Sequence, residues 1–337
     1  MSSIPVFVGL DYHQNAVQVC VVDSDGTVLG NKSCPNDGPR IVAYVERLGS
    51  VKRVAIEACT GAANLADELV ERAGWSVDLA HAGYVARIKQ GPDKSDFADA
   101  HLLADLERVG YLPRVWLAPE KIRTLRRMVR YRQQLMNERR NVKLRIRALL
   151  REHRLHCGLG RPWTKPWMHW LRKTGDLDEN SRWIVNHYLT RLDALVEEVA
   201  ATHERLRHLT ADDAVVAKLQ TFCGVGEITA WMLRAEIGRF DRFGSGKQLA
   251  RFCGLSPRNA SSGTRQADAG LVKAGNPQLR AILIETAHRL MRFDPRWMAF
   301  TAQMLARGKK KSVIAAAVGN RWMRWLYHQM QEVTVAA

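Results

Sequence analysis

The sequence lacks the features that mark membrane-spanning, zinc-binding and disulfide-rich proteins. It contains no stretch of about 20 apolar residues, and its N-terminus has no basic segment followed by a long apolar run. The 6 cysteines are scattered along the chain, without a Cys-x-x-Cys pair. That usage favours buried free thiols in a reducing cytosol over zinc sites or disulfides. We therefore expect a cytoplasmic protein with no membrane partner.

Composition excludes a disordered chain and indicates a polyanionic partner. Hydrophobic residues make up 46% of the 337 residues, enough for a substantial core and for two domains of about 150 residues each. The formal net charge is +17. From Met1 to Leu112 there are 10 Lys and Arg against 15 Asp and Glu, so the remaining residues carry +22. An acidic domain therefore precedes a strongly basic one, which we expect to bind nucleic acid.

The N-terminal part has the pattern of a mixed-sheet domain. Three apolar or alternating runs, with a turn at Asp25-Gly26, predict an antiparallel meander. Strands and helices then alternate, so the sheet is expected to be mixed and covered on both faces. The predicted strands are Val6–Leu10, Ala16–Val22, Val28–Leu29, Arg53–Ile56 and Val77–Ala80, and the predicted helices are Gly38–Leu48, Asn64–Ala73 and a segment that opens at Lys94 and ends near Val109.

Four carboxylates in this part are candidates for a metal site. Asp11 and Glu57 stand where predicted strands run into loops, and Asp96 and Asp99 lie three residues apart on one helix face. Hard oxygen ligands suit Mg²⁺ (or Mn²⁺), which can hold a scissile phosphate and stabilise the attacking and leaving oxygens. For the helix pair the alternative is capping, with Ser95 or Asp96 at the N-cap.

The order of these acids along the chain resembles the order of the acids in a known fold. An Asp that ends the first strand, a Glu that ends a middle strand and an Asp-x-x-Asp helix are similar to the RuvC-like core of ribonuclease-H-fold nucleases. The segments IEACTG and KSDFADAHLLA resemble the N-terminal DEDD domain of transposases of the insertion-sequence one-ten family, to which the Piv-type DNA invertases are related. The resemblance covers roughly residues 5–110 and implies a catalytic, metal-binding role for Asp11, Glu57, Asp96 and Asp99.

Glu120 to Arg154 is predicted to form almost one helix, since it holds no glycine or proline. It contains 13 Lys and Arg against 3 Glu. Arg132 and Arg139 fall on an imperfect heptad seam, in which residues recur every seven positions. The seam consists of Met128, Leu135, Val142 and Leu149, with Leu125, Arg132, Arg139 and Ile146 at the companion position. A second helix, about Ser181 to Leu209, is expected to return antiparallel along the first. One interpretation is a solvated basic helix packed on its own domain; we prefer a helical hairpin or an oligomer contact whose arginines bind nucleic acid.

The C-terminal part contains a candidate phosphate-binding turn and basic loops. Gly224-Val-Gly226 lies between two predicted helices, as in a helix-hairpin-helix, with plain helix packing as the alternative. Ser261 and Ser262 precede a glycine among cations, which suits a serine that attacks a phosphodiester, although an ordinary polar loop has the same composition. The candidate nucleic-acid-binding cations here are Arg258, Arg265, Lys273, Arg280, Lys309, Lys310 and Lys311.

Cys223 to Arg280 resembles the C-terminal transposase domain of the same family. The shared landmarks are G-V-G, A-E-I-G, F-x-x-x-K-Q-L-A, G-L-x-P-R, S-G and K-A-G-N-x-x-L-R. In that family a serine directly before the glycine attacks DNA and forms a covalent phosphoserine intermediate, which implies Ser262 here; chemistry alone leaves Ser261 open. The resemblance also implies a structured guide RNA, encoded by the element (a bridge RNA), that pairs with donor and target DNA.

We therefore predict an α/β domain joined to all-α parts. These are a RuvC-like mixed-sheet domain at residues 1–112, a long helical or coiled-coil insertion at 113–210 and a mainly helical C-terminal domain with a helix-hairpin-helix at 211–337. The predicted function is a transposase or site-specific DNA recombinase of an insertion sequence, associated with the nucleoid. Its expected partners are donor and target DNA, a guide RNA and further copies of the chain, in a homodimer or tetramer whose subunits share each catalytic centre. The alternatives are a metal-dependent structure-specific nuclease of the junction-resolvase kind, a DNA invertase and a non-catalytic nucleic-acid-binding protein.

Overall fold

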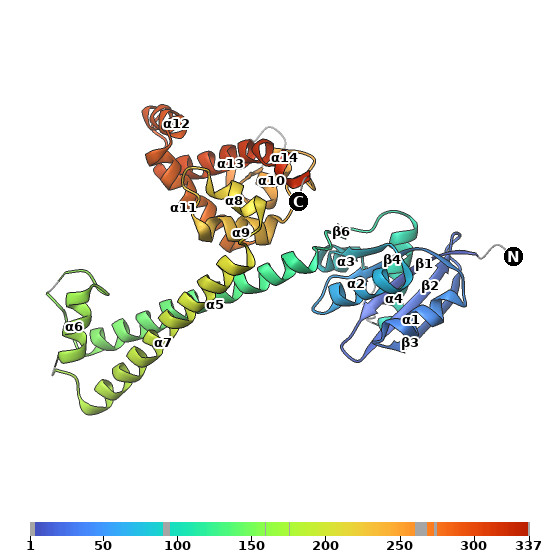
Figure 1. Cartoon of the computed structure of the whole chain (residues 1–337), viewed down its shortest axis with the longest axis horizontal. Coiled ribbons are helices and arrows are strands. Elements are labelled where there is room, and N and C mark those ends of the chain that lie inside the picture. Colours follow the sequence, from blue (N-terminus) through green and yellow to red (C-terminus); the bar gives the residue numbers. More distant parts are fainter. Residues whose placement is uncertain are drawn as a thin grey trace. The chain divides into compact units, whose positions relative to one another are not determined.

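The computed structural model describes residues 4–89, 95–158, 160–174, 176–259, 268–272 and 275–335. The chain divides into two units, Met1–Ala118 and Pro119–Ala337 (Figure 1). The first is a mixed α/β unit, consistent with the predicted RuvC-like DEDD domain, and the second is mostly helical. The first unit runs to Ala118 because β6 (Arg114–Val115) adds the last strand of its sheet. The predicted boundaries at residues 112 and 210 stay predictions.

A six-stranded sheet in the order β3-β2-β1-β4-β5-β6 forms the centre of the first unit. β1, β2 and β3 form the antiparallel meander, β4 and β5 continue parallel to β1, and β6 is antiparallel to β5. The sheet is therefore mixed, as predicted. Its other strands are β1 (Pro5–Tyr12), β2 (Ala16–Asp23), β3 (Val28–Pro35), β4 (Ser50–Glu57) and β5 (Val77–Ala80).

Helices cover both faces of this sheet. On one face the alternate residues Val6, Val8 and Leu10 of β1 pack against α1 (Gly38–Glu46) and α2 (Ala62–Ala73). On the other face α4 (Asp96–Arg108) packs on β1 and β2, and α3 (Ala82–Ile88) contributes to the same side. Because helices cover both faces of the sheet, polar side chains can gather at the carboxyl ends of the central strands β1 and β4.

Two long helices, α5 (Glu120–Glu152) and α7 (Glu179–Leu209), run antiparallel in the second unit (Figure 1). The short helix α6 (Lys165–Lys173) lies at the far end of the pair. Leu135, Val142 and Ile146 of the predicted seam are buried in one cluster with leucines of α7. The partner of the seam is therefore α7 of the same chain, and the seam itself gives no reason to expect an oligomer.

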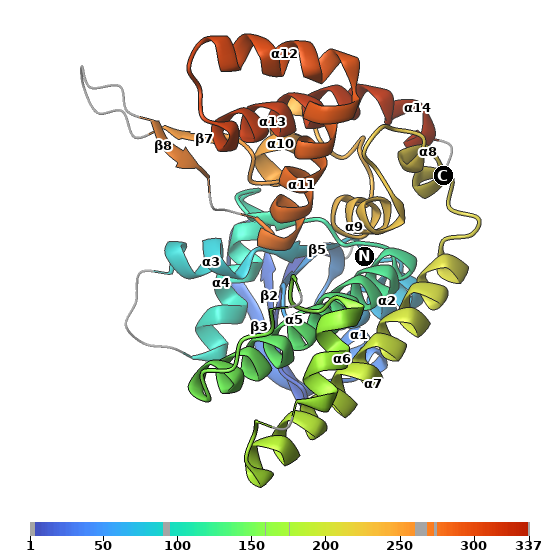
Figure 2. The ribbon, with the colours of Figure 1, turned by 90° about the vertical axis from the view of Figure 1, so that its left-hand side faces the viewer.

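The rest of the second unit is a group of helices around one apolar core. Trp231, Phe240 and Trp322 are among its largest fully buried side chains. α10, α11 and α12 all pack on α13, and a short β-hairpin, β7–β8, was not predicted (Figure 2). The elements are α8 (Ala214–Gln220), α9 (Glu227–Ile237), α10 (Gly246–Phe252), β7 (Pro257–Asn259), β8 (Asp268–Leu271), α11 (Pro277–Phe293), α12 (Pro295–Ala306), α13 (Lys311–Gln329) and α14 (Gln331–Val335).

The cysteines follow the prediction only in part. Cys20, Cys34 and Cys253 are buried free thiols, as expected, but Cys59 and Cys223 are exposed. Both lie in connecting segments, one directly after β4 and one before α9, and connections run over protein surfaces.

Among the described residues, no helix combines the length and the apolar character that are needed to cross a bilayer.

Candidate metal centre and nucleic-acid interface

Asp11 and Glu57 are neighbours at one edge of the sheet. β1 and β4 are parallel and pair Leu10 with Ile56, so the next residues of the two strands are Asp11 and Glu57. Leu10 and Ile56 point into the core on the side of α1 and α2, and successive side chains alternate along a strand. Asp11 and Glu57 therefore point toward the face that α4 covers.

Gly9 explains why α4 can lie directly against β1. A Cβ atom at position 9 would overlap the backbone carbonyl oxygen of Ala100 and the backbone nitrogen of Ala104. Since glycine has no Cβ, the helix backbone packs on the strand backbone without a side chain between them. This close approach brings the N-terminal turn of α4 to the end of β1 where Asp11 lies.

The first turn of α4 carries Asp96 and Asp99. The N-cap of this helix is Ser95, whose hydroxyl accepts a hydrogen bond from the backbone nitrogen of Ala98 at 3.2 Å. Capping is therefore supplied by the serine. The two aspartates complement the positive end of the helix dipole and keep their carboxylates available for other contacts.

Asp11, His13 and Asp96 form a tight cluster, because one ligand atom from each lies within 4.8 Å of the others. The imidazole Nε2 of His13 is 3.3 Å from Oδ2 of Asp11 and 3.4 Å from Oδ2 of Asp96. Burial raises the pKa of the Asp11 carboxyl, the charge of His13 lowers it, and the charges of Asp96 and Asp99 raise it again. The cluster therefore concentrates negative charge that a cation would neutralise.

Asp99 and Glu57 border this cluster. Asp99 forms an ion pair with Lys89, the residue that follows α3. Burial raises the pKa of the Cys59 thiol, and the negative charges of Glu57 and Asp11 contribute to the rise. The charges of Glu57 and Asp11 thus both raise the pKa of the Cys59 thiol, and the charge of Asp99 raises the pKa of Asp11. Asp11 and Asp96 belong to the cluster itself, whereas Glu57 lies next to Asp11 across the parallel strands and Asp99 lies in the same helix turn as Asp96.

The donor set fits a divalent cation. The negative charges of Asp96 and Asp99 raise the pKa of Asp11, so these carboxylates repel one another, and an ion held between them would remove that repulsion. Oxygen ligands suit Mg²⁺ and Mn²⁺, whereas an imidazole nitrogen is more usual around softer transition metals. The carboxylates of Asp11 and Asp96 are therefore the ligands that fit such an ion, and His13 is placed to neutralise and orient them.

Gly224 and Gly226 belong to the turn between α8 and α9. Gly224 has a φ of 77°, in the left-handed region that favours glycine, and its carbonyl accepts a hydrogen bond from Nη1 of Arg289 at 3.0 Å. Gly226 is exposed and is the N-cap of α9. The next residue, Glu227, forms an ion pair with Arg207. A carboxylate therefore already lies at this helix N-terminus, where it would compete with a phosphate.

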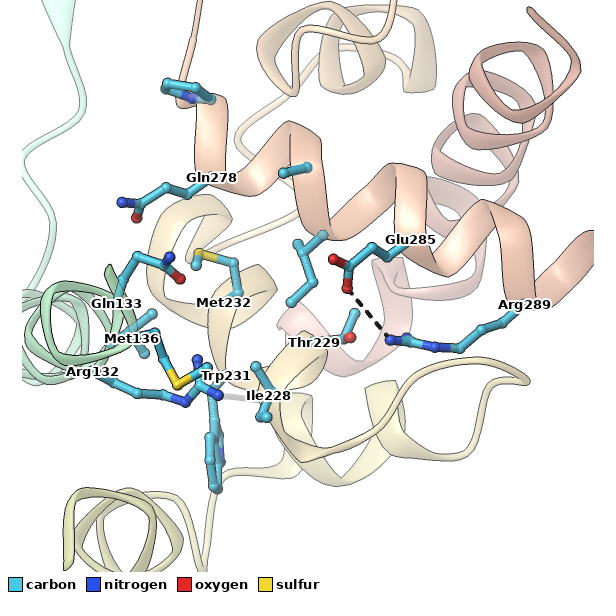
Figure 3. Close-up of a pocket in the computed structure, with 14 residues that line it drawn as sticks. Arg132, Gln133, Met136, Ile228, Thr229, Trp231, Met232, Gln278, Glu285 and Arg289 are labelled. Atoms are coloured by element: carbon cyan, nitrogen blue, oxygen red, sulfur yellow. Dashed lines mark ion pairs between the residues drawn. The ribbon is translucent and has the colours of Figure 1, made fainter. Parts of the chain in front are cut away.

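The two seam arginines have different surroundings. Arg132 is 9% exposed, and its Nε donates a hydrogen bond to Nε2 of His203 at 2.7 Å. It lines a cavity of about 430 Å³ between α5, α9 and α11 (Figure 3). Arg139 is half-buried and lines the next cavity along α5. Arg132 is thus reachable from that cavity and not from an exposed helix surface.

The other predicted cations are mostly at the surface. Arg258 is exposed on β7, and Lys309, Lys310 and Lys311 are exposed where α13 begins. Arg280 of α11 is half-buried, and its Nη1 atom has no hydrogen-bond partner within the described ranges. Four residues of the prediction lie outside the described residues: Ser261, Ser262, Arg265 and Lys273.

Comparison with known proteins identifies both halves of the chain. Residues 8–154 match a family model described as a transposase, of the DEDD type of IS110. Residues 216–302 match the model described as "Transposase IS116/IS110/IS902 family". The chain belongs to this family of transposases. In this transposase the first match contains all four candidate metal-binding acids, and the second contains the turn at Gly224 and the serine pair.

Three relatives illustrate the similarity. The transposase is 31% identical to y4qE of Sinorhizobium fredii, over 67% of this chain and 62% of that protein. It is 26% identical to the transposase for insertion sequence element IS1111A of Coxiella burnetii, over 96% of this chain and 90% of that one. It is also 26% identical to the transposase for insertion sequence element IS1328 of Yersinia enterocolitica, over 80% of this chain and 81% of that one.

Sequence reasoning missed His13 and Lys89 of this transposase. Both contact acids of the predicted set, His13 through Asp11 and Asp96 and Lys89 through Asp99. A signal for His13 was present, because it follows Asp11 by two residues at the end of a strand. Lys89 gave no signal, since only the packing of α3 beside α4 brings its ammonium group to the acid.

Proposed function

We propose that this transposase cuts and rejoins the DNA of an insertion sequence, assisted by a divalent metal at Asp11, Glu57, Asp96 and Asp99. The observation that supports this most directly is the cluster of Asp11 and Asp96, with Asp99 close enough to raise the pKa of Asp11. Two relatives are named as transposases of insertion sequence elements, which supports the reaction class.

The residues proposed to hold Mg²⁺ or Mn²⁺ are Asp11 and Asp96, with Glu57 and Asp99 beside them. Such an ion, when bound, supplies positive charge to a scissile phosphate and to the oxygens on which charge develops. The protein supplies the positions: parallel strands fix Asp11 and Glu57, and α4 fixes the two other carboxylates. His13 holds Asp11 and Asp96 near one another, and Lys89 partly neutralises Asp99.

Ser262 is the proposed nucleophile, on the grounds of its position before a glycine in the family pattern. Its hydroxyl oxygen forms a bond to phosphorus, and the bond from that phosphorus to one deoxyribose oxygen breaks. The released hydroxyl takes up the proton that the serine loses, so atoms and charge balance without another reactant. Attack by a different DNA hydroxyl on the phosphoserine reverses the step and joins a new pair of strands.

The proposed partners are donor and target DNA, a structured guide RNA and further copies of the chain as a homodimer or tetramer. The net charge of +22 beyond Leu112 supports polyanionic partners. The oligomer is not supported by the heptad seam, which α7 of the same chain fills. The proposed nucleic-acid-binding residues are Gly224, Gly226, Arg258, Arg265, Lys273, Arg280, Arg132, Arg139, Lys309, Lys310 and Lys311.

The test is to trap the covalent intermediate on a plasmid that carries the ends of the element, with copurifying RNA retained. With Mg²⁺ or Mn²⁺ we expect strand cutting and a protein–DNA adduct that survives denaturation. Chelation of the metal should abolish both, and added metal should restore them. Ser262→Ala should lose the adduct, whereas the matched variant Ser261→Ala should keep it.

Two results would redirect the assignment. If Ser261→Ala alone loses the adduct, the nucleophile is the neighbouring serine. Metal-dependent cutting with no adduct in any variant would instead indicate a structure-specific nuclease, in which the serine only positions phosphate.

A further inference from the structure

Three cavities follow one side of α5 in the second unit. The first, of about 430 Å³, lies between α5, α9 and α11; the second, of about 470 Å³, lies beside the middle of α5; and the third, of about 330 Å³, lies near α6. The first and second share Gln133 and Met136, and the second and third share Arg147. Because neighbouring cavities share lining residues, we describe the three together as the α5 groove, which extends along α5 from Val129 to Arg151. At 1.5 Å per residue it is about 33 Å long.

The cations that α5 contributes to the groove lack acidic partners in the described part of the chain. Its α5 cations are Arg132, Arg139, Arg140, Lys143, Arg147 and Arg151. None of them forms an ion pair with a carboxylate in the described part of the chain. The single carboxylate among the lining residues is Glu285 of α11, which lies 3.7 Å from Arg289 (Figure 3).

Crowding of these cations is visible in their electrostatics. Burial lowers the pKa of the Arg132 guanidinium, and the positive charge of Arg139 lowers it further. Burial likewise lowers the pKa of the Lys143 ammonium, and Arg139 again contributes. Like charges that destabilise one another are stabilised by an anion placed among them. The groove therefore favours an anionic occupant along its length.

Apolar and aromatic side chains alternate with these cations. Figure 3 shows Met136 reaching from α5 toward Ile228 and Trp231 of α9, beside Arg132. In the second cavity Leu144 is 43% exposed, and the ring of Trp163 lies 4.8 Å from Nζ of Lys143. Such flat or apolar faces beside cations are the elements with which proteins stack bases and hold the phosphates between them.

The backbone at Trp163 supports a binding role. This residue has a φ of 72°, in the left-handed region that bulky side chains rarely adopt. Strained backbone of this kind persists where the surrounding structure enforces it, and it concentrates at ligand-contacting positions. The half-buried indole ring of Trp163 lies at the wall of the groove, with the ring of Trp167 at 4.6 Å between centroids on the hairpin side.

We propose that the α5 groove binds an extended single strand of nucleic acid. A duplex keeps its base faces stacked inside and presents mainly phosphates, so it would use the cations but not Trp163, Leu144 and Met136. An acidic peptide would likewise satisfy only the charges. The inference rests on the proposed action on nucleic acid, but it needs neither the metal nor the serine, because binding is separable from cutting.

The test measures binding of the full-length protein to fluorescent oligo(dT) and oligo(U), in chelator so that no strand is cut. The groove variant Arg140→Gln/Arg147→Gln is compared with Arg145→Gln/Arg205→Gln. The control pair removes the same charge from exposed side chains on α5 and α7 that do not line the groove. The groove pair should weaken single-strand binding about tenfold and reduce the salt-dependence slope by roughly 1.4, whereas the control pair should change both little.

A second comparison tests the stacking surface. Trp163→Ala should weaken single-strand binding by about tenfold, Trp163→Phe should keep most of it, and Trp183→Ala should leave it unchanged. Trp183 is a suitable control because it is 62% exposed on α7 and does not line the groove. Because Trp163 also packs at the end of the hairpin, Leu144→Asp is measured too; this exposed position tolerates the change, and the added negative charge should weaken binding.

Three results would overturn the proposal. They are an equal loss in the control pair, an equal loss of duplex binding in the groove pair, and displacement of the strand by polyglutamate as effectively as by unlabelled oligonucleotide. A preference between oligo(dT) and oligo(U) identifies DNA or RNA as the strand. Unchanged single-strand binding in the groove pair would also overturn the proposal. Loss of cutting in Asp11→Asn or Ser262→Ala, with normal single-strand binding, would concern the proposed function alone.

Discussion

At the carboxyl ends of the first unit's strands, carboxylates from β1 and α4 meet in one small cluster with Glu57 of β4 beside it, whereas in the α5 groove cations follow one another for about 33 Å. Both arrangements place like charges together, which costs free energy in the isolated protein. They differ in shape. A compact group of carboxylates matches a single small cation, and a line of arginines and lysines matches a polymer with charges at regular intervals.

A second contrast lies within the basic unit. Acids buried in this unit are matched to cations: Asp213 accepts from the buried Arg234 at 2.8 Å, and Glu236 accepts from the more exposed Arg130 at 3.0 Å. The groove cations of α5 have no such partners among the described residues, and only Arg289 of α11 lies near an acid, Glu285. Pairing therefore distinguishes cations that hold the fold together from cations that are available to a ligand.

The largest expected effect concerns the acid cluster. Asp11→Asn should reduce strand cutting by roughly a thousandfold, because it removes a charge at the centre of the proposed metal site. Binding of nucleic acid should remain within about twofold, since it depends on the basic unit. The matched control is Asp25→Asn, an exposed acid of the β2–β3 turn, which should cut normally. If Asp11→Asn loses cutting and nucleic-acid binding equally, then cutting does not depend on the first unit and binding on the second in the way proposed.

The next effect tests the paired cations of the core. Asp213→Ala should lower the free energy of unfolding by about 3–5 kcal/mol, because Arg234 would be left buried without its acid. Asp213 and Arg234 are 5% and 8% exposed, and Asp213 also caps α8. As a control, Asp241→Ala breaks a more exposed ion pair with Arg239 and should cost at most about 1 kcal/mol. If chemical denaturation shows that both variants lose a similar free energy of unfolding, the buried ion pair is no more important to the fold than the exposed one.

The smallest expected effect tests how the acids are brought together. Gly9→Ala should lower the free energy of unfolding by about 1–3 kcal/mol, because the new Cβ overlaps the backbone of α4. Cutting should fall as well, since the displaced helix carries Asp96 and Asp99. Gly158→Ala, where the new atom meets nothing within 4 Å, should change thermal unfolding little. Normal cutting in a destabilised Gly9→Ala protein would mean that α4 can shift without disturbing the cluster.

Much of the fold was predictable because local patterns are strong in this chain. Alternating valines predicted β2, and the absence of glycine and proline predicted α5 to within two residues of its observed end at Glu152. Several of the elements that were not predicted are short. α3, α6 and the β7–β8 hairpin have no long periodic pattern, and their formation depends on the neighbours on which they pack.

For the candidate site, too, some features follow from the sequence and others only from the tertiary structure. The sequence by itself determined that Asp11 and Glu57 end strands, that Asp96 and Asp99 share a helix face, and that positive charge accumulates after Leu112, because these follow from residue order and periodicity. Only the tertiary structure decided that Leu10 pairs with Ile56 and that the missing side chain of Gly9 lets α4 pack directly on β1. It likewise decided that His13 contacts Asp11 and that Lys89 contacts Asp99. It also decided that α7 fills the seam of α5 and leaves a groove on the other side. Those outcomes depend on contacts between residues far apart in sequence, which packing and register set and local pattern does not.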